Sequence, residues 1–200
     1  VEVRPRKCNC PIRPPTELDS MPLTPPTAEP LSLRIALLSD THNAVDRRIV
    51  EVVEGCDLVV HAGDIGSPDV LAKLLPISGR VLAVRGNNDT PEQWPPGTER
   101  CLRILPEYLS LDVPGGVIVV VHGHRVNPAY RRHQALRERY PDARAIVYGH
   151  THRLVVDDSI QPWVLNPGAA GFTRTQGAPS CLVLTATPSD WRVDIHAFRD

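Results

Sequence analysis

The chain has few aromatic residues, almost no net charge and no long apolar run, and each shortage argues against a class of protein. Phe, Trp and Tyr make up 4% of its 200 residues, which argues against stacking platforms for single-stranded nucleic acid. A formal net charge of −1 argues against binding of long duplex nucleic acid, which requires a basic domain or a basic face. No apolar run reaches the ~18 residues of a membrane span, and the first residues lack the apolar core of a signal peptide. We therefore expect no membrane partner and a cytoplasmic location.

Length and proline distribution predict one domain behind a tail. A chain of 200 residues with 42% hydrophobic content suffices for one substantial core. Eight of the 21 prolines fall within residues 1–30, so we expect this segment to be a disordered or weakly packed tail and residues 31–200 to form a single domain. The only methionine is Met21, and we expect residues 1–20 to derive from upstream sequence rather than from selection for function.

Alternating apolar runs and helical patterns predict an α/β domain. Runs rich in β-branched and aliphatic residues predict buried strands, and the strands become denser after His152. Helices are expected at 44–54, with Gly55 as C-cap, at 69–75 after Ser67-Pro68, and from Asn127-Pro128 to about Tyr140. Two packed sheets with helices outside fit this order. The predicted strands are 33–38, 58–60, 81–84, 117–121, 145–147, 153–156, 163–165, 180–186 and 191–197.

Residues that commonly bind metals recur at the ends of these runs. Carboxylate, amide and imidazole donors together suit first-row divalent ions such as Mn, Fe, Ni and Zn, whereas an all-oxygen set favours Mg or Ca. Seven ligands suffice for two ions only if one carboxylate bridges, and such a pair supports in-line displacement at phosphorus. Glycines precede three of the seven, where a tight bend or a close backbone approach is needed. The seven are Asp40, His42, Asp64, Asn87, His122, His150 and His152.

Five short blocks, each unremarkable by itself, contain these residues. The blocks are Asp40-Thr41-His42, Gly63-Asp64, Gly86-Asn87-Asn88-Asp89, His122-Gly123-His124 and Gly149-His150-Thr151-His152, with a later Leu165-Asn166-Pro167-Gly168 segment. Together they resemble the calcineurin-like metallophosphoesterases, in particular their small bacterial and archaeal phosphodiesterase branch. The resemblance runs from about Leu33 to about Gly171 and implies two mixed β-sheets packed as a sandwich and flanked by helices. It implies one metal at Asp40, His42, Asp64 and His152 and another at Asp64, Asn87, His122 and His150, so that Asp64 bridges.

The third block departs from the wider family. Asn88 stands where many members have the histidine that protonates the leaving group, and an amide cannot serve as a general acid near neutral pH. His124 is a candidate catalytic acid in its place, although a role in orienting a ligand is the favoured alternative. Asp89 is expected to support the cluster by hydrogen bonding rather than to act as an acid.

The surroundings of the metals give weaker indications of the substrate. Arg125 is a candidate phosphate ligand, and Asn87 is expected to contact both metal and phosphate. The segment Trp94-Pro95-Pro96 is expected either to form a wall against a base or aromatic leaving group or to be a rigid surface loop. His133 lies outside every block and is expected to be an ordinary surface or edge histidine.

The predicted function is hydrolysis of small phosphodiesters by a dinuclear centre, two divalent ions that share a bridging hydroxide. We expect Mn, with Ni, Fe or Zn as alternatives. Phosphomonoester or dinucleotide hydrolysis on the same centre remains open. A different alternative is a non-catalytic scaffold, because a retromer subunit of this fold has a degenerate metal site and serves protein assembly. The resemblance also implies a possible homo-oligomer, a dimer or tetramer.

Overall fold

The computed structural model describes residues 32–172 and 175–199. The predicted tail, residues 1–30, lies outside these ranges. The division of the chain into a tail and one domain therefore stays a prediction.

The first of two sheets contains the strands that begin and end the domain. Its order is β10-β9-β1-β2-β3; β1, β2 and β3 run parallel, and β9 is antiparallel to both of its neighbours. The carboxyl ends of β1, β2 and β3 therefore meet at one edge of the sandwich. The strands are β1 (Leu33–Leu38), β2 (Leu58–His61), β3 (Arg80–Ala83), β9 (Ser180–Ala186) and β10 (Trp191–Ala197).

The second sheet is also mixed, with the order β4-β5-β6-β8-β7. Its three central strands are parallel, and the edge strands β4 and β7 are antiparallel to their neighbours. The strands are β4 (Tyr108–Val113), β5 (Gly116–Val121), β6 (Ala145–Tyr148), β7 (Leu154–Asp157) and β8 (Trp163–Pro167).

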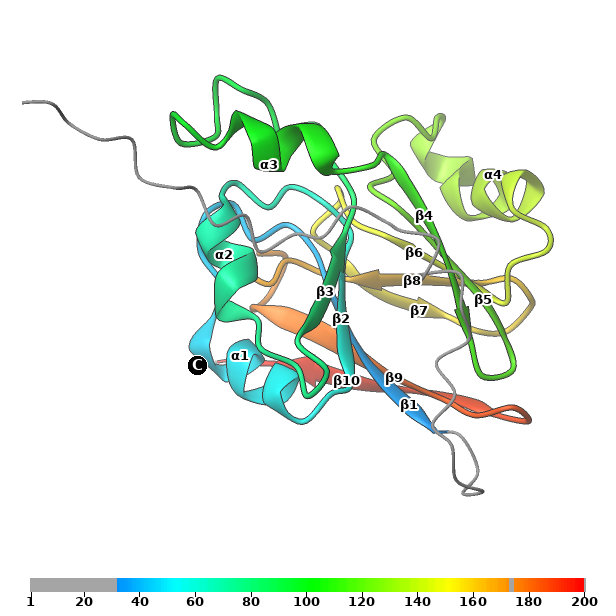
Figure 1. Ribbon diagram of the computed structural model, residues 1–200. Helices are drawn as coiled ribbons and strands as arrows, with labels where there is room; N and C mark the ends of the chain where they lie inside the picture. The colour runs from blue at the N-terminus through cyan, green and yellow to red at the C-terminus, as the bar shows by residue number, and fades with distance from the viewer. Residues whose placement is uncertain (1–31, 173–174, 200) are drawn as a thin grey trace, which may run out of the picture.

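Helices cover the outer faces of the two sheets (Figure 1). Helices α1 (Arg47–Glu54), α2 (Pro68–Lys73) and α3 (Glu99–Ile104) pack on the first sheet, and α4 (Arg132–Arg139), preceded by the short η2 (Ala129–Arg131), packs on the second. The expected sandwich of two mixed sheets flanked by helices is confirmed. Within the described ranges, no helix has the length and apolar character to cross a bilayer.

Strand β1 shows why the central strands are continuously apolar. Ile35 and Leu37 face the core between the sheets, whereas Ala36 and Leu38 face the helices on the outer side. All four are fully buried. A strand buried on both faces has no polar alternation, so its sequence reads as an uninterrupted apolar run.

Several predicted boundaries were wrong. The helix expected at 44–54 begins at Arg47, because Asp46 caps it by accepting a hydrogen bond from the Arg48 N–H. The helix expected at 69–75 ends at Lys73, because Leu74 is already extended. The segment after Asn127-Pro128 first forms η2 and becomes α-helical only at Arg132, without a side-chain cap. Helix α3 and strand β4 were not predicted.

Candidate metal centre

All seven predicted ligands lie in loops that follow the carboxyl ends of five parallel strands. The loops after β1, β2 and β3 of the first sheet carry Asp40, His42, Asp64 and Asn87. The loops after β5 and β6 of the second sheet carry His122, His150 and His152. The centre therefore forms only when the two sheets are packed against each other.

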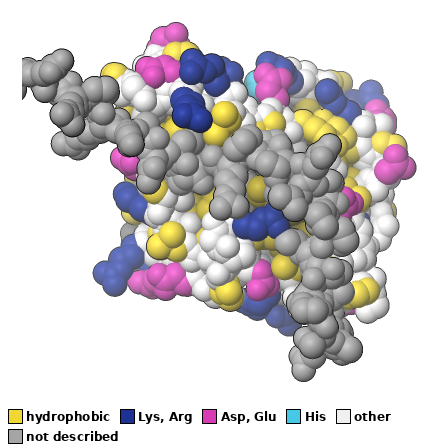
Figure 2. Space-filling model, viewed as in Figure 1, with side chains coloured by type: hydrophobic (Ala, Val, Ile, Leu, Met, Phe, Trp, Pro, Cys, Tyr) yellow, Lys and Arg dark blue, Asp and Glu magenta, His cyan; other side chains and the backbone are white. Residues whose placement is uncertain are grey.

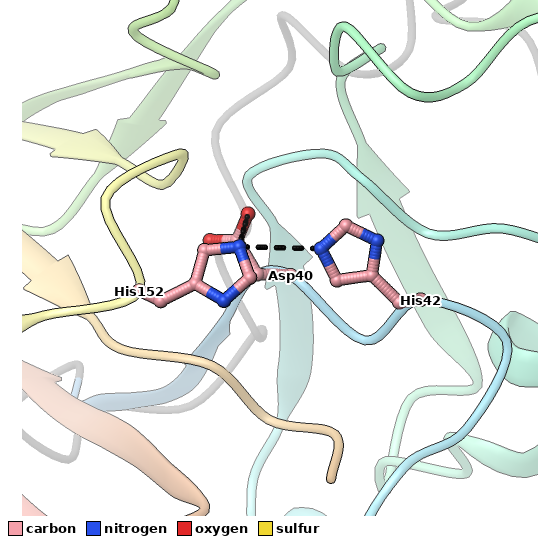
Figure 3. A group of neighbouring side chains, drawn as sticks. All are labelled: Asp40, His42 and His152. Carbon is pink, nitrogen blue, oxygen red and sulfur yellow. Dashed lines mark hydrogen bonds and ion pairs between the residues drawn. The ribbon is translucent and has the colours of Figure 1, made fainter. Parts of the chain in front are cut away.

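Three of these side chains form one compact group (Figure 3). The Nε2 atoms of His42 and His152 are 3.2 Å apart, and His152 Nε2 is 3.4 Å from Asp40 Oδ1. Ligand atoms of Asp40, His42 and His152 all lie within 4.8 Å of one another. Two imidazole nitrogens and a carboxylate that face one space form a donor set suited to a first-row divalent ion.

The other predicted ligands form a second, adjoining group. His122 Nε2 is 3.4 Å from Asp64 Oδ2 and 3.1 Å from Asn87 Oδ1. Asn87 Oδ1 is in turn 2.9 Å from His150 Nδ1. The backbone carbonyl of Ala62 accepts a hydrogen bond from His122 Nδ1 at 2.7 Å, so Nε2 is the nitrogen that faces Asp64 and Asn87.

The carboxylates of Asp40 and Asp64 lie close to both groups. Asp64 Oδ2 is 3.9 Å from His42 Nε2 as well as 3.4 Å from His122 Nε2. Ligand atoms of Asp40, Asp64 and His122 also lie within 4.8 Å of one another. The donor set fits two neighbouring divalent ions that share a carboxylate, and the bridging role of Asp64 itself stays a prediction.

Asn88 also contacts Asp64. Its side-chain amide donates to Asp64 Oδ2 at 2.6 Å, and its backbone N–H donates to Oδ1 at 2.8 Å. Asn88 therefore orients the carboxylate, which is a function that an amide can perform although it cannot transfer a proton.

Three of the predicted ligands are deprotonated near neutral pH, which suits metal binding. Burial raises the pKa of Asp40 to about 6, although the charge of His122 opposes this. Burial lowers the pKa of His150 to about 4. Burial would also raise the pKa of Asp64, but hydrogen bonds from His122 and Asn88, with the charge of His122, outweigh it and hold that pKa below its ordinary value. At pH 7 these three side chains therefore present the deprotonated forms that coordinate metals.

The ligand residues adopt an unusual backbone conformation. Asp40, His42, Asp64, His150 and His152 have φ angles between 43° and 66°, in the left-handed region that residues other than glycine rarely adopt. Each such residue costs on the order of 1–3 kcal/mol, and the surrounding structure must compensate. Strain of this kind clusters at functional sites.

On the first sheet, Asp89 holds the loops in place. Its carboxylate accepts hydrogen bonds of 2.8–3.0 Å from the backbone N–H groups of Asp64, Ile65, Gly66 and Gly86. The indole of Trp94 donates to it at 2.9 Å. Trp94 itself is buried, so it does not form an exposed wall of the site. Pro95 and Pro96 are exposed in the loop between β3 and α3, as the surface-loop alternative expected.

A glycine before the ligand allows the loops of β2 and β3 to approach closely. A Cβ atom at Gly86 would collide with the carboxylate and the backbone nitrogen of Asp64. The glycine before Asn87 therefore makes room for Asp64, in agreement with the close approach expected from the sequence.

Two buried residues support the loop after β1. His61 Nδ1 accepts a hydrogen bond from the Gly63 N–H, so Nε2 carries the proton and donates to Thr41 Oγ1 at 3.0 Å. The Thr41 hydroxyl then donates to the Ile65 carbonyl. This chain fixes Thr41 between its neighbours Asp40 and His42.

On the second sheet, side chains hold the loop after β6. Asn166 donates to the Gly149 carbonyl at 2.9 Å and to Thr151 Oγ1 at 3.0 Å. The hydroxyl of buried Tyr148 lies 3.0 Å from His133 Nε2, and His133 Nδ1 lies 2.8 Å from Asp157 Oδ2. His133 was expected to be an ordinary surface or edge histidine; the structure instead places it, half-buried, in a hydrogen-bond network that ends beside the ligand loop.

The two tentative catalytic and phosphate-binding residues lie at the margin of the centre. The His124 ring centroid is 5.5 Å from that of His122 and 6.3 Å from that of His150. Burial lowers the pKa of His124. Both terminal nitrogens of Arg125 donate to the carboxylate of Glu107, so Arg125 does not point freely at the metal site. Their roles toward substrate stay predictions.

Comparison with known proteins identifies the family. A sequence model of the calcineurin-like phosphoesterase superfamily domain matches residues 33–189. The chain therefore belongs to this superfamily, and the resemblance seen in its five blocks is confirmed.

Individual relatives share the sequence or the fold. A phosphodiesterase of Methanocaldococcus jannaschii is 25% identical over 175 residues, which cover 80% of this chain and 97% of that protein. The structure of vacuolar protein sorting 29 from Cryptosporidium parvum aligns with a TM-score of 0.65 at 21% identity and covers 85% of this chain and 100% of that one. A structure described as a novel archaeal phosphodiesterase gives a TM-score of 0.60 at 23% identity, with coverages of 82% and 100%. These structural matches show a shared fold.

Proposed function

We propose that this protein is a metal-dependent phosphodiesterase that hydrolyses small phosphodiesters through a dinuclear metal centre. The observation that carries the proposal is the position of Asp64 Oδ2, within 3.9 Å of His42 Nε2 in one donor group and within 3.4 Å of His122 Nε2 in the other. Family membership and the archaeal phosphodiesterase relative support the same reaction class.

Each ion would have ligands from both sheets. One would be held by Asp40, His42, Asp64 and His152, and the other by Asp64, Asn87, His122 and His150. When bound, two such ions supply a bridging hydroxide near neutral pH and neutralise charge on the phosphoryl oxygens. The mixed oxygen and nitrogen donors suit first-row divalent ions in general. We propose Mn, with Ni, Fe or Zn as alternatives.

The residues beside the ions determine which esters react well. The oxygen of the leaving group must gain a proton or depart as a stable anion, and Asn88 cannot supply that proton. The ring of His124 lies 5.5 Å from that of His122, and His124 remains the candidate donor beside the alternative that it orients a ligand. We therefore propose diesters with good leaving groups as the preferred substrates.

Charges of both signs are mixed on the surface, which argues against long duplex nucleic acid as a partner. Figure 2 shows basic and acidic side chains interspersed over the face it displays, in keeping with the net charge of −1. A large field of one sign would be needed to attract long duplex nucleic acid. A cytoplasmic location and a homo-oligomer, dimer or tetramer, stay predictions.

Two alternatives use the same fold differently. Phosphomonoesters or dinucleotides could be hydrolysed at the same donor cluster. A protein-binding scaffold is the other alternative, and the likeness to vacuolar protein sorting 29 keeps it open. The complete set of seven donors favours an enzyme, because a scaffold does not need them.

Hydrolysis by metal-stripped protein refilled with Mn, Ni, Zn or Mg in turn tests the proposal. Bis-p-nitrophenyl phosphate and p-nitrophenyl phosphate serve as the diester and the monoester. We expect metal-dependent turnover that favours the diester. Preference for the monoester would make the protein a phosphatase, and absence of turnover with every ion would favour the scaffold.

A further inference from the structure

A small cavity adjoins the candidate metal centre on the outer side of the second sheet. It lies where the start of β4, the end of β5 and the end of α4 meet, and it has a volume of about 110 Å³. Ligand pockets for whole molecules usually measure about 300–1,000 Å³, so this cavity has room for one group of a substrate only. Its lining includes Glu107, Tyr108, His124, Val126, Arg139 and Tyr140.

Aromatic and aliphatic groups dominate the lining. The rings of Tyr108 and Tyr140 are stacked, with centroids 5.7 Å apart and planes inclined by 19°. The guanidinium of Arg139 lies over the Tyr140 ring, 5.6 Å from its centroid. Because these groups already stack on one another, an occupant would meet the edges of the rings and the exposed part of Tyr108, which is 47% exposed, and aromatic rings pack well in both arrangements. Such a lining favours a flat ring.

Charge at this cavity is largely compensated. Arg125 is held by the carboxylate of Glu107, so neither residue presents an unpaired charge to an occupant. Arg139 contributes a cation at the tyrosine face. An anionic phosphoryl group would find stronger attraction at the metal centre, and an uncharged ring fits the cavity better.

The cavity and the centre share a wall. His122, a predicted ligand, lines the cavity, and so does His124, whose ring lies 6.3 Å from that of the predicted ligand His150. A diester with its phosphorus at the ions could therefore extend one substituent past His124 into the cavity.

We propose that this cavity binds the aromatic ring of the leaving group and thereby selects aryl or nucleobase-like esters over alkyl esters. The proposal rests on the proposed phosphodiesterase function and names its substrate class. The aromatic wall that the sequence suggested at Trp94 is supplied instead by Tyr108 and Tyr140, since Trp94 is buried against Asp89.

The test compares two methyl phosphodiesters whose leaving groups have similar acidity but different shape. One carries a phenyl group and the other a hexafluoroisopropyl group. We expect the Mn-loaded wild type to prefer the phenyl ester in kcat/KM, and we expect Tyr140→Leu to reduce that preference about three- to tenfold, the range for loss of one aromatic contact. Tyr130→Leu is the matched control, because Tyr130 is 87% exposed and lies outside the cavity lining. An unchanged preference in a folded Tyr140→Leu protein would overturn the proposal.

A binding measurement separates the failure of this proposal from failure of the proposed function. Calorimetry compares phenylphosphonate with methylphosphonate on the Mn-loaded protein, and it needs no turnover. Tighter binding of phenylphosphonate, reduced by Tyr140→Leu and retained by Tyr130→Leu, supports the cavity even if no diester is hydrolysed. Equal affinities in the wild type would refute the cavity even if diesters are hydrolysed.

Discussion

The two sheets contribute to the centre in different ways. The first sheet carries the predicted carboxylate and amide ligands and one predicted imidazole ligand, and the loops that carry them are joined by backbone hydrogen bonds. Asp40 N–H donates to the Gly63 carbonyl and His42 N–H to the Asp64 carbonyl, each at 3.0 Å. The second sheet carries three predicted imidazole ligands. The loop after β6 makes a backbone hydrogen bond to the loop after β5, from the Gly149 N–H to the His122 carbonyl, and is further held by side chains: Asn166, Tyr148 and the Asp40 carboxylate, which accepts from the His150 N–H.

Because of this difference, substitutions on the two sheets should affect different properties of the protein: its folding stability or its affinity for metal. A buried carboxylate that accepts many backbone hydrogen bonds, as Asp89 does, is part of the folded core, and its loss is costly to the whole domain. A hydroxyl or an imidazole that orients a ligand loop changes metal affinity more than folding. We therefore expect substitutions on the first sheet to lower stability and those on the second to lower metal affinity.

Asp64→Asn is expected to have the largest effect, because Asp64 lies between the two donor groups. Loss of its negative charge should lower diester hydrolysis by about 10³-fold, roughly 4 kcal/mol, and reduce bound metal. Activity assays together with metal analysis of the purified protein measure both effects. Two tightly bound ions and full activity in this variant would contradict the bridging assignment.

Asp89→Asn tests the hydrogen bonds by which Asp89 holds the loops of the first sheet, called here the first-sheet network. One of the two oxygens that receive the N–H groups of Asp64, Ile65, Gly66 and Gly86 becomes an amide nitrogen. We expect the free energy of unfolding to fall by about 3 kcal/mol, measured by urea denaturation without added metal. Exposed Asp142→Asn is the control, with an expected change within about 0.5 kcal/mol. Equal stabilities of these two variants would refute a structural role for the network.

Acid should lower the free energy of unfolding through His61, which supports the loop after β1 on the first sheet. Burial lowers the pKa of His61 from 6.5 to about 3, so between these values the unfolded state binds the proton that the folded state does not. The stability that neutral His61 contributes is present above pH 6.5 and is lost as the pH falls toward 3, by up to about 1.4 kcal/mol per pH unit. Denaturation across pH 4–7 should show a shallower dependence for His61→Gln than for the wild type. Parallel curves would show that His61 does not titrate in this way.

Tyr148→Phe should have the smallest effect and tests the second sheet. It keeps the buried ring but removes the hydroxyl that lies 3.0 Å from His133 Nε2. We expect metal affinity to fall about tenfold with little change in unfolding free energy. Metal titration of this variant beside exposed Tyr130→Phe measures the effect. A loss of stability without a loss of affinity would remove the distinction between the sheets.

Much of the fold could be predicted, because buried strands such as β1 and β5 leave continuous aliphatic runs in the sequence. Strand β4 was missed: buried Leu109 and Leu111 alternate with exposed Tyr108, Ser110 and Asp112, which is not a continuous apolar run. Helix α3 was missed because only Cys101 and Leu102 of its six residues are buried.

The seven predicted ligands could be selected from the sequence because each follows an apolar run that predicts a strand, and their binding of metal stays a prediction. Their supports could not all be found, because the partners are far apart in the chain. His133 meets Asp157 at a separation of 24 residues and Tyr148 at 15, and nothing local to His133 marks either contact. The cavity beside His124 likewise combines residues of β4, β5 and α4, and only the packed second sheet brings them together.

Titration of metal-stripped protein with Mn, while bis-p-nitrophenyl phosphate hydrolysis is followed, tests the central claim most directly. Donors from both sheets that enclose two adjoining sites predict that turnover requires two ions per chain, and that Asp64→Asn abolishes this stoichiometry. Full turnover at one ion per chain, or turnover without added metal, would contradict a dinuclear centre at the junction of the sheets.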